Sequence, residues 1–258
     1  MIVDTHAHLN DSRLAPDVDQ WLQEARAVDV KLIINVGADV ESSRLAVSQA
    51  ASHDELVAAV GVHPHEAKSW NAQMEVDLLE LLEHPKVCAY GEIGLDYYYD
   101  FSPKHIQQEV FAAQLRIAKA KRLPVIIHDR CAHQDVLRIL EQNGPYPAGG
   151  VMHCYSGSAE MLPAYLDLGF CISFAGPLTF RNAKRPALAA AEVPDDRLLV
   201  ETDCPYLSPE PYRGKLNHPA RVVHIVERLA ELRGVEFATI ASQTTSNALR
   251  LFGLGSGD

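Results

Sequence analysis

The chain has 258 residues, 47% of them hydrophobic, and its 34 acidic and 23 basic side chains give a formal net charge of −11. This apolar content excludes a mainly disordered protein, and the negative charge argues against a nucleic-acid-binding face spread over the whole surface. No apolar stretch reaches the roughly 18 to 20 residues that cross a bilayer, and the N-terminus has no signal-peptide pattern. With five scattered cysteines and no CxxC pair, we expect a soluble, cytoplasmic protein without a membrane partner.

Short apolar runs alternate with longer amphipathic segments along the chain. The apolar runs lie at 2–6, 31–37, 56–63, 87–94, 124–129, 150–154, 170–176 and 198–203. The helical patterns lie near 17–28, 40–52, 74–83, 104–121, 133–142, 158–168, 182–191, 219–233 and 237–252. Runs that are apolar almost throughout are typical of parallel strands buried on both faces. Eight βα units in about 250 residues predict an α/β fold, a single-domain (β/α)8 TIM barrel over 1–258, with a doubly wound open sheet as the alternative.

Six of the eight predicted strands end in a histidine or a carboxylate. These strand ends carry His6 (followed by His8), His63, Glu92, His128, His153 and Asp203. The C-terminal ends of TIM-barrel strands meet at one mouth, where active sites are built. Buried imidazole and carboxylate groups without a partner would be costly, whereas together they are good ligands for divalent metals. The sequence therefore predicts a metal site at the mouth of the barrel.

The number and spacing of these side chains favour two metal ions. His6 and His8 are two residues apart, so both point to one side of a strand and can bind the same ion. The set exceeds what one catalytic zinc takes and suffices for two ions that share a carboxylate. We expect one ion on His6, His8 and Asp203, the other on His128 and His153, and Glu92 as the bridge. Mg²⁺, Mn²⁺ and Zn²⁺ are all compatible with these ligands.

The strand-end motifs resemble those of a known family. In chain order they are VDTHAHL (3–9), GVHPH (61–65), GEIGLDYY (91–98), HDR (128–130), HCYSG (153–157) and ETDCPYL (201–207). They resemble the signature motifs of the TatD family of metal-dependent deoxyribonucleases, in particular its YcfH-like branch. The resemblance implies an amidohydrolase-like TIM barrel with Glu92 where many relatives have a carboxylated lysine, and Mg²⁺- or Mn²⁺-supported 3′ to 5′ exonuclease activity. Cys204 departs from the family, in which Ser or Ala is commoner there.

Other residues near the predicted mouth are candidates for catalysis and substrate binding. We expect Asp203 to be the general base that takes a proton from the attacking water. His63 is a candidate contact to a substrate phosphate or leaving group, with a structural role as the alternative. The candidate substrate contacts are Arg213 and Arg130, whose guanidinium groups match phosphate oxygens, and Asp96 and Tyr97 in the loop after the fourth strand. Tyrosines there can stack on a nucleobase, or pack the loop.

Together with these residues, the resemblance implies a hydrolase that cleaves phosphodiester bonds at the 3′ ends of single-stranded DNA, which we expect to be a monomer. A strand end suits a narrow mouth better than an intact duplex, and an acidic surface disfavours tight duplex binding. The alternative enzyme uses the same metals on an amide, a lactone or an ester such as that of a D-aminoacyl-tRNA. A non-enzymatic metal-binding scaffold is the third possibility, although mixed ligands with a candidate base favour open positions for water.

Overall fold

Eight parallel strands form one sheet in which each strand pairs with the next along the chain. The computed structural model describes residues 1–99 and 101–255. Its strands are β1 (Ile2–Ala7), β2 (Val30–Val36), β3 (Leu56–Val60), β4 (Val87–Asp96), β5 (Val125–Arg130), β6 (Gly150–Met152), β7 (Phe170–Phe174) and β8 (Leu198–Val200). A parallel bridge between Ala7 and Cys204 brings the first and last strands together. The nearly closed sheet in chain order confirms the TIM barrel, because a doubly wound sheet has a different strand order.

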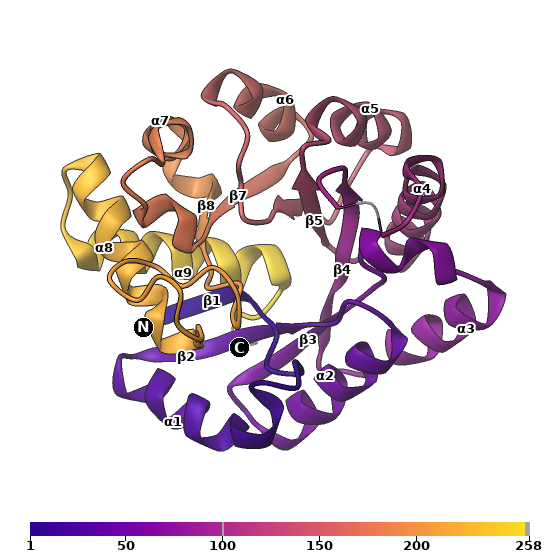
Figure 1. Cartoon of the computed structure of the whole chain (residues 1–258), viewed down its shortest axis with the longest axis horizontal. Coiled ribbons are helices and arrows are strands. Elements are labelled where there is room, and N and C mark those ends of the chain that lie inside the picture. The colour runs from indigo at the N-terminus through magenta and orange to yellow at the C-terminus, as the bar shows by residue number, and fades with distance from the viewer. Residues whose placement is uncertain (100, 256–258) are drawn as a thin grey trace.

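Helices follow the strands and surround the barrel (Figure 1). They are α1 (Val18–Ala27), α2 (Val40–Ser52), α3 (Ala72–Leu81), α4 (Lys104–Lys121), α5 (His133–Asn143), α6 (Leu162–Asp167), α7 (Lys184–Glu192), α8 (Val222–Arg233) and α9 (Phe237–Phe252). Within the ranges that the structure describes, no helix has both the length and the apolar character needed to span a membrane.

Helix α9 closes the N-terminal end of the barrel. The hydroxyl of Thr245 donates to the carbonyl oxygen of Met1, and the side chain of Asn247 donates to that of Leu198, the first residue of β8. Phe252, at the end of the helix, belongs to a buried apolar cluster with side chains from the strands. Since α9 covers this end, the opposite end, where the predicted ligands lie, is the one that can admit a substrate.

Five strands end earlier than predicted, and three of them, β3, β6 and β8, stop before the predicted ligand or contact at their ends, which are His63, His153 and Asp203. After β6 and β8 the backbone enters the left-handed region, with φ 43° at Cys154 and 55° at Asp203, which a regular strand does not contain. After β3 the chain forms a 3-10 turn (Pro64–Ser69) capped by His63. The three side chains are therefore held by turns at the mouth and not by the strands themselves.

Candidate metal centre

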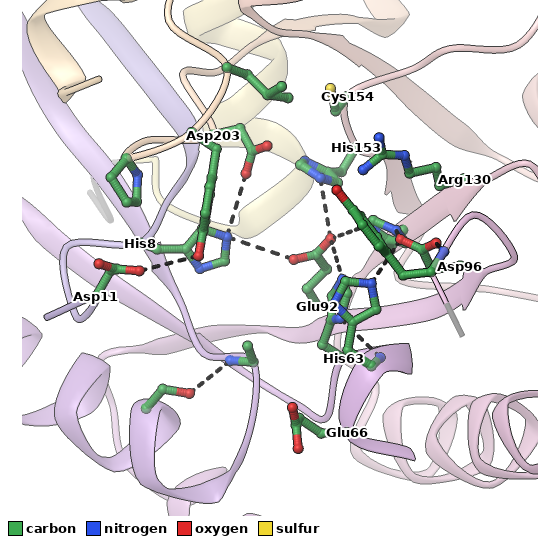
Figure 2. Close-up of a pocket in the computed structure, with 18 of the residues that line it drawn as sticks. His8, Asp11, His63, Glu66, Glu92, Asp96, Arg130, His153, Cys154 and Asp203 are labelled. Atoms are coloured by element: carbon green, nitrogen blue, oxygen red, sulfur yellow. Dashed lines mark hydrogen bonds and ion pairs between the residues drawn. The ribbon is translucent and has the colours of Figure 1, made fainter. Parts of the chain in front are cut away.

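The C-terminal ends of the strands surround one cavity of about 960 Å³. Figure 2 shows labelled side chains from several strands pointing into this space. Five of the six predicted metal ligands line it, namely His8, Glu92, His128, His153 and Asp203. The sixth, His6, is fully buried next to Glu92. Side chains that are far apart in the sequence therefore lie together at the mouth.

Glu92 lies at the centre of the group and is almost fully buried (Figure 2). Its Oε1 lies 2.7 Å from His128 Nδ1 and 3.2 Å from His153 Nε2. Its Oε2 lies 3.4 Å from His6 Nε2 and 3.7 Å from His8 Nε2. Burial raises the pKa of Glu92, but the surrounding imidazoles and the hydrogen bond from His128 outweigh burial and hold this pKa well below its ordinary value. Each oxygen of one carboxylate thus faces a different set of histidines.

His6, His8 and Asp203 form one group of possible ligands, in which one ligand atom of each lies within 4.8 Å of the others. The Nε2 atoms of the two histidines are 3.1 Å apart, and Asp203 Oδ1 lies 3.5 Å from His8 Nε2. His8 Nδ1 lies 2.8 Å from the carbonyl oxygen of Val36. Because a carbonyl oxygen only accepts, the proton of a neutral His8 is on Nδ1, and its Nε2 presents a lone pair to the group.

Glu201 is a buried carboxylate at this site that the sequence reasoning missed. Its Oε1 lies 2.7 Å from His153 Nδ1 and accepts the backbone N–H of Cys154 at 2.7 Å. With His6 and His153 it forms a further group of possible metal ligands. The signal in the sequence is a glutamate inside the last predicted strand (198–203), two residues before Asp203. Its contact with Nδ1 leaves the Nε2 of His153 facing Glu92.

His63 lies with Glu92 and His128 in a third group of possible ligands. Its Nε2 is 3.7 Å from Glu92 Oε1, and its Nδ1 accepts the backbone N–H of His65. Burial, the largest cause, keeps the pKa of His63 well below its ordinary value, so the ring is neutral. Because Nδ1 accepts, the proton is on Nε2. His63 therefore presents a hydrogen-bond donor to the cavity.

Asp96 connects the centre to the loop after β4. Its Oδ2 accepts hydrogen bonds from His65 Nε2 at 2.9 Å and from His128 Nε2 at 3.0 Å. Its Oδ1 accepts the backbone N–H groups of Tyr98 and Tyr99. Burial raises the pKa of Asp96, but these hydrogen bonds outweigh burial and lower the pKa below its ordinary value. Asp96 lines the cavity, as predicted for a substrate contact, and its hydrogen bonds also hold His128 and the loop in place.

The other predicted substrate contacts lie in different places. Arg130 lines the cavity. Tyr97 is not among the described residues that line it, and its hydroxyl donates to Asp135 at 2.8 Å. Arg213 also lies outside this lining, with its guanidinium carbon 4.3 Å from the centre of the Phe180 ring. Of these three side chains, only that of Arg130 is close to the candidate metal ligands.

Gly94 allows β4 and β5 to approach each other beside the centre. Its backbone has φ +144° and pairs with His128 in the sheet. A Cβ atom at this position would lie 2.0 Å from the carbonyl oxygen of His128. Any side chain here would force the backbones of β4 and β5 apart at His128, so their close approach beside the centre depends on this glycine.

A family model described as TatD related DNase matches residues 3–253. The chain belongs to the TatD family. YabD of Bacillus subtilis (strain 168), whose name describes an uncharacterized metal-dependent hydrolase, is 46% identical over 98% of this chain and 99% of its own. YcfH of Escherichia coli (strain K12), named in the same way, is 43% identical over 97% of this chain and 95% of its own. The predicted family and branch are therefore confirmed.

Two further TatD-family relatives cover the whole barrel. A protein of Escherichia fergusonii named 3′-5′ ssDNA/RNA exonuclease TatD is 34% identical over 97% of this chain and 98% of its own. The crystal structure of YJJV, a TatD homologue of Escherichia coli K12, matches with a TM-score of 0.93 and 31% identity over 98% of both chains. As a TatD-family member the protein is a metal-dependent hydrolase, which confirms the coarser part of the predicted function.

Proposed function

We propose that the protein hydrolyses phosphodiester bonds at the 3′ ends of single-stranded DNA with the help of two divalent cations. The observation that carries this proposal is the position of Glu92, whose two oxygens face two different sets of histidines within 3.7 Å. This is the arrangement expected of a carboxylate shared by two ions.

The donor set fits two cations. His6, His8 and Asp203 would hold one ion, His128 and His153 the other, and Glu92 would bridge them. Burial lowers the pKa of His153, but Glu201 and Glu92 outweigh burial and raise this pKa well above its ordinary value. The same negative charges favour a divalent cation in place of that proton. Bound here, Mg²⁺, Mn²⁺ or Zn²⁺ would make a water reactive near neutral pH and stabilise charge on the phosphoryl oxygens.

Two side chains, those of Asp203 and His63, would then act on the proton of the attacking water and on the leaving group. Asp203 lines the cavity and is only partly engaged by His8, so its carboxylate can take a proton from the attacking water. His63 presents an N–H group to the same space, which suits a hydrogen bond to the leaving oxygen or to a phosphate oxygen. Arg130 supplies a positive charge at the rim for a further phosphate oxygen.

The choice of a phosphodiester rests on two observations. A relative at 34% identity is named as an exonuclease of single-stranded DNA and RNA. Arg130 lines the cavity and pairs with no carboxylate within residues 1–99 and 101–255, which supports a phosphate as its partner. An ester or amide substrate needs no such cation, although it could use the same water and base.

The test is an assay panel with 5′-labelled single-stranded DNA, a blunt duplex of the same sequence, and a set of carboxylic esters, run with Mg²⁺ or Mn²⁺. We expect stepwise removal of nucleotides from the 3′ end of the single strand. Glu92→Gln should lower this rate by more than about a hundredfold. Even the loss of a group that only orients a metal ligand lowers metal affinity or activity about 10- to 100-fold. The matched control Glu80→Gln changes an exposed glutamate of α3 and should leave the rate unchanged.

Hydrolysis of esters without cleavage of any phosphodiester by the metal-loaded protein would reject the proposed bond type. Nicking of duplex interiors as fast as trimming of single strands would reject the preference for strand ends.

A further inference from the structure

We propose that two aromatic platforms on opposite sides of the cavity hold bases of a single DNA strand on either side of the bond that is cleaved. The first platform consists of Tyr98, Tyr99, Phe101 and Arg130, and the second consists of Tyr206 and Arg13. The proposal deepens the proposed function, because it says how a strand end would be seated over the metal centre.

Exposed aromatic side chains are concentrated at the mouth. In the described part of the chain five aromatic residues are exposed, and four of them are Tyr98 (62%), Tyr99 (40%), Phe101 (53%) and Tyr206 (47%). All four lie in loops that follow the C-terminal ends of β4 and β8. Large apolar rings next to a polar centre are costly to leave in water unless a ligand covers them. Their clustering therefore points to a planar, apolar group as the ligand.

The first platform lies beside His128 and combines a parallel pair of rings that line the cavity, Tyr99 and Phe101, with the ring of Tyr98, which is perpendicular (88°) to that of Tyr99 and lies outside the lining. The rings of Tyr99 and Phe101 are parallel within 4° with centres 5.2 Å apart. The guanidinium carbon of Arg130 lies 4.2 Å from the ring centre of Tyr98 and 4.9 Å from that of Tyr99. His65 meets the ring of Phe101 edge-on at 4.8 Å and fixes its orientation. A nucleobase can extend such a stack, and Arg130 can contact the adjoining phosphate.

The second platform lies beside the other pair of histidines. The hydroxyl of Tyr206 donates to Asp11 Oδ2 at 3.2 Å, and the guanidinium carbon of Arg13 lies 4.6 Å from the centre of the Tyr206 ring. Arg13 also donates two hydrogen bonds to Asp11, at 2.8 and 2.9 Å. The ring is thus held in place 6.1 Å from that of His8. Because Arg13 neutralises Asp11, the carboxylate does not repel a negatively charged strand.

The two platforms face each other across the candidate ligands. One follows β4 and β5 and the other follows β1 and β8, which are on opposite sides of an eight-stranded barrel in chain order. Figure 2 shows the same relation for labelled residues, with Arg130 and Asp96 on one side of Glu92 and His8 and Asp11 on the other. A phosphodiester over Glu92 would therefore have a flat platform on each side. Both platforms lack a hydrogen-bonding pattern that reads a base, so we expect little sequence preference.

The test combines single variants with abasic substrates. Phe101→Ala and Tyr206→Ala each remove one platform ring, and Phe237→Ala is the matched control, an aromatic residue that is 39% exposed at the start of α9, at the other end of the barrel. The substrates are a short single-stranded oligonucleotide and the same strand with an abasic residue at its last or second-last position. For the wild type, we expect an abasic residue at either position to lower kcat/KM about 5- to 150-fold.

The effects of a platform substitution and of an abasic residue on kcat/KM should not be additive. Phe101→Ala should lower kcat/KM by a similar factor on the intact strand, and an abasic residue at the position that Phe101 holds should cost this variant nothing more. Tyr206→Ala should behave in the same way toward the other position. Additive losses, or losses below about twofold for both variants, would overturn the proposal.

A binding measurement separates this proposal from the proposed function. Fluorescence anisotropy of a labelled oligonucleotide is recorded with Asp203→Asn protein in Mg²⁺, with and without the platform substitutions. Weaker binding in the platform variants supports the platforms even if the wild type cleaves no DNA, in which case the proposed function alone fails. Cleavage of DNA with binding that does not depend on the platforms overturns the platforms alone. No binding and no cleavage overturns both.

Discussion

Glu201 offers a sharp test of how the centre is held, because it touches a candidate ligand without being one of the expected six. Its Oε1 lies 2.7 Å from His153 Nδ1 and accepts the backbone N–H of Cys154 at the same distance. Its Oε2 has no hydrogen-bond partner among the described residues. Glu201→Gln can therefore keep the hydrogen bond from Cys154 and the contact with His153 through one oxygen, and lose only the charge. Glu201→Ala loses the charge, the hydrogen bond and the contact.

The expected size of each effect follows from these contacts. Loss of a partner that orients a metal-bound histidine costs about 10- to 100-fold in metal affinity, so the Gln variant, which loses only the charge, should lose about tenfold. The Ala variant also frees the imidazole of His153 to turn away from Glu92. Its loss should approach the roughly hundredfold seen when the partner of a metal-bound histidine is removed.

These affinities are measured by isothermal titration calorimetry, in which Mn²⁺ is added to protein whose metal has been removed with a chelator. The second measurement is activity at saturating metal. If Glu201 only positions His153, both variants should regain most of the wild-type kcat once the metal sites are filled. Glu80→Gln is the control for a change of one negative charge on the surface. If both Glu201 variants bind Mn²⁺ within about threefold of the wild type, the positioning role is wrong.

Three further predictions concern single residues. Asp203→Asn should abolish turnover with an unchanged circular dichroism spectrum and melting temperature, and retention of most activity would reject its role as the general base. Gly94→Ala should lower the free energy of unfolding by about 1–3 kcal/mol in urea, because a Cβ atom would meet the carbonyl oxygen of His128 at 2.0 Å; an unchanged midpoint would show that β4 and β5 can separate freely. Arg130→Ala should lower kcat/KM on single-stranded DNA while Arg213→Ala changes it less than about twofold, since only Arg130 lines the cavity; the opposite ranking would contradict this placement.

The strands, the helices and the position of the site could be predicted from the sequence because they depend on local patterns of residues. Apolar runs of strand length, separated by helical segments, predict the barrel because parallel strands that are buried on both faces are apolar almost throughout. The strand-end positions of Glu92, His128 and Asp203 predict a shared mouth because TIM-barrel topology brings all these ends together. The motif GEIGLD also contains Gly94, but its role became visible only when β5 was placed beside it.

The features that were missed depend on contacts between distant segments and on the direction of side chains in turns. Glu201 acts on His153, which comes from a different strand, and no local pattern connects the two. Tyr97 and Arg213 were expected at the cavity, but the alternation of side chains that holds within a strand no longer applies in the loops where they lie. Strand β8 ends at Val200 and the backbone at Asp203 is left-handed, which the apolar pattern of the sequence does not indicate.

The central claim is that one carboxylate, that of Glu92, serves two cations. The most direct measurement is the number of metal ions bound per chain after complete chelation and titration with Mn²⁺, read by native mass spectrometry. We expect two ions on the wild-type chain and loss of at least one of them in Glu92→Gln. A wild-type chain that never binds more than one ion, at any concentration that leaves it folded, would contradict the account.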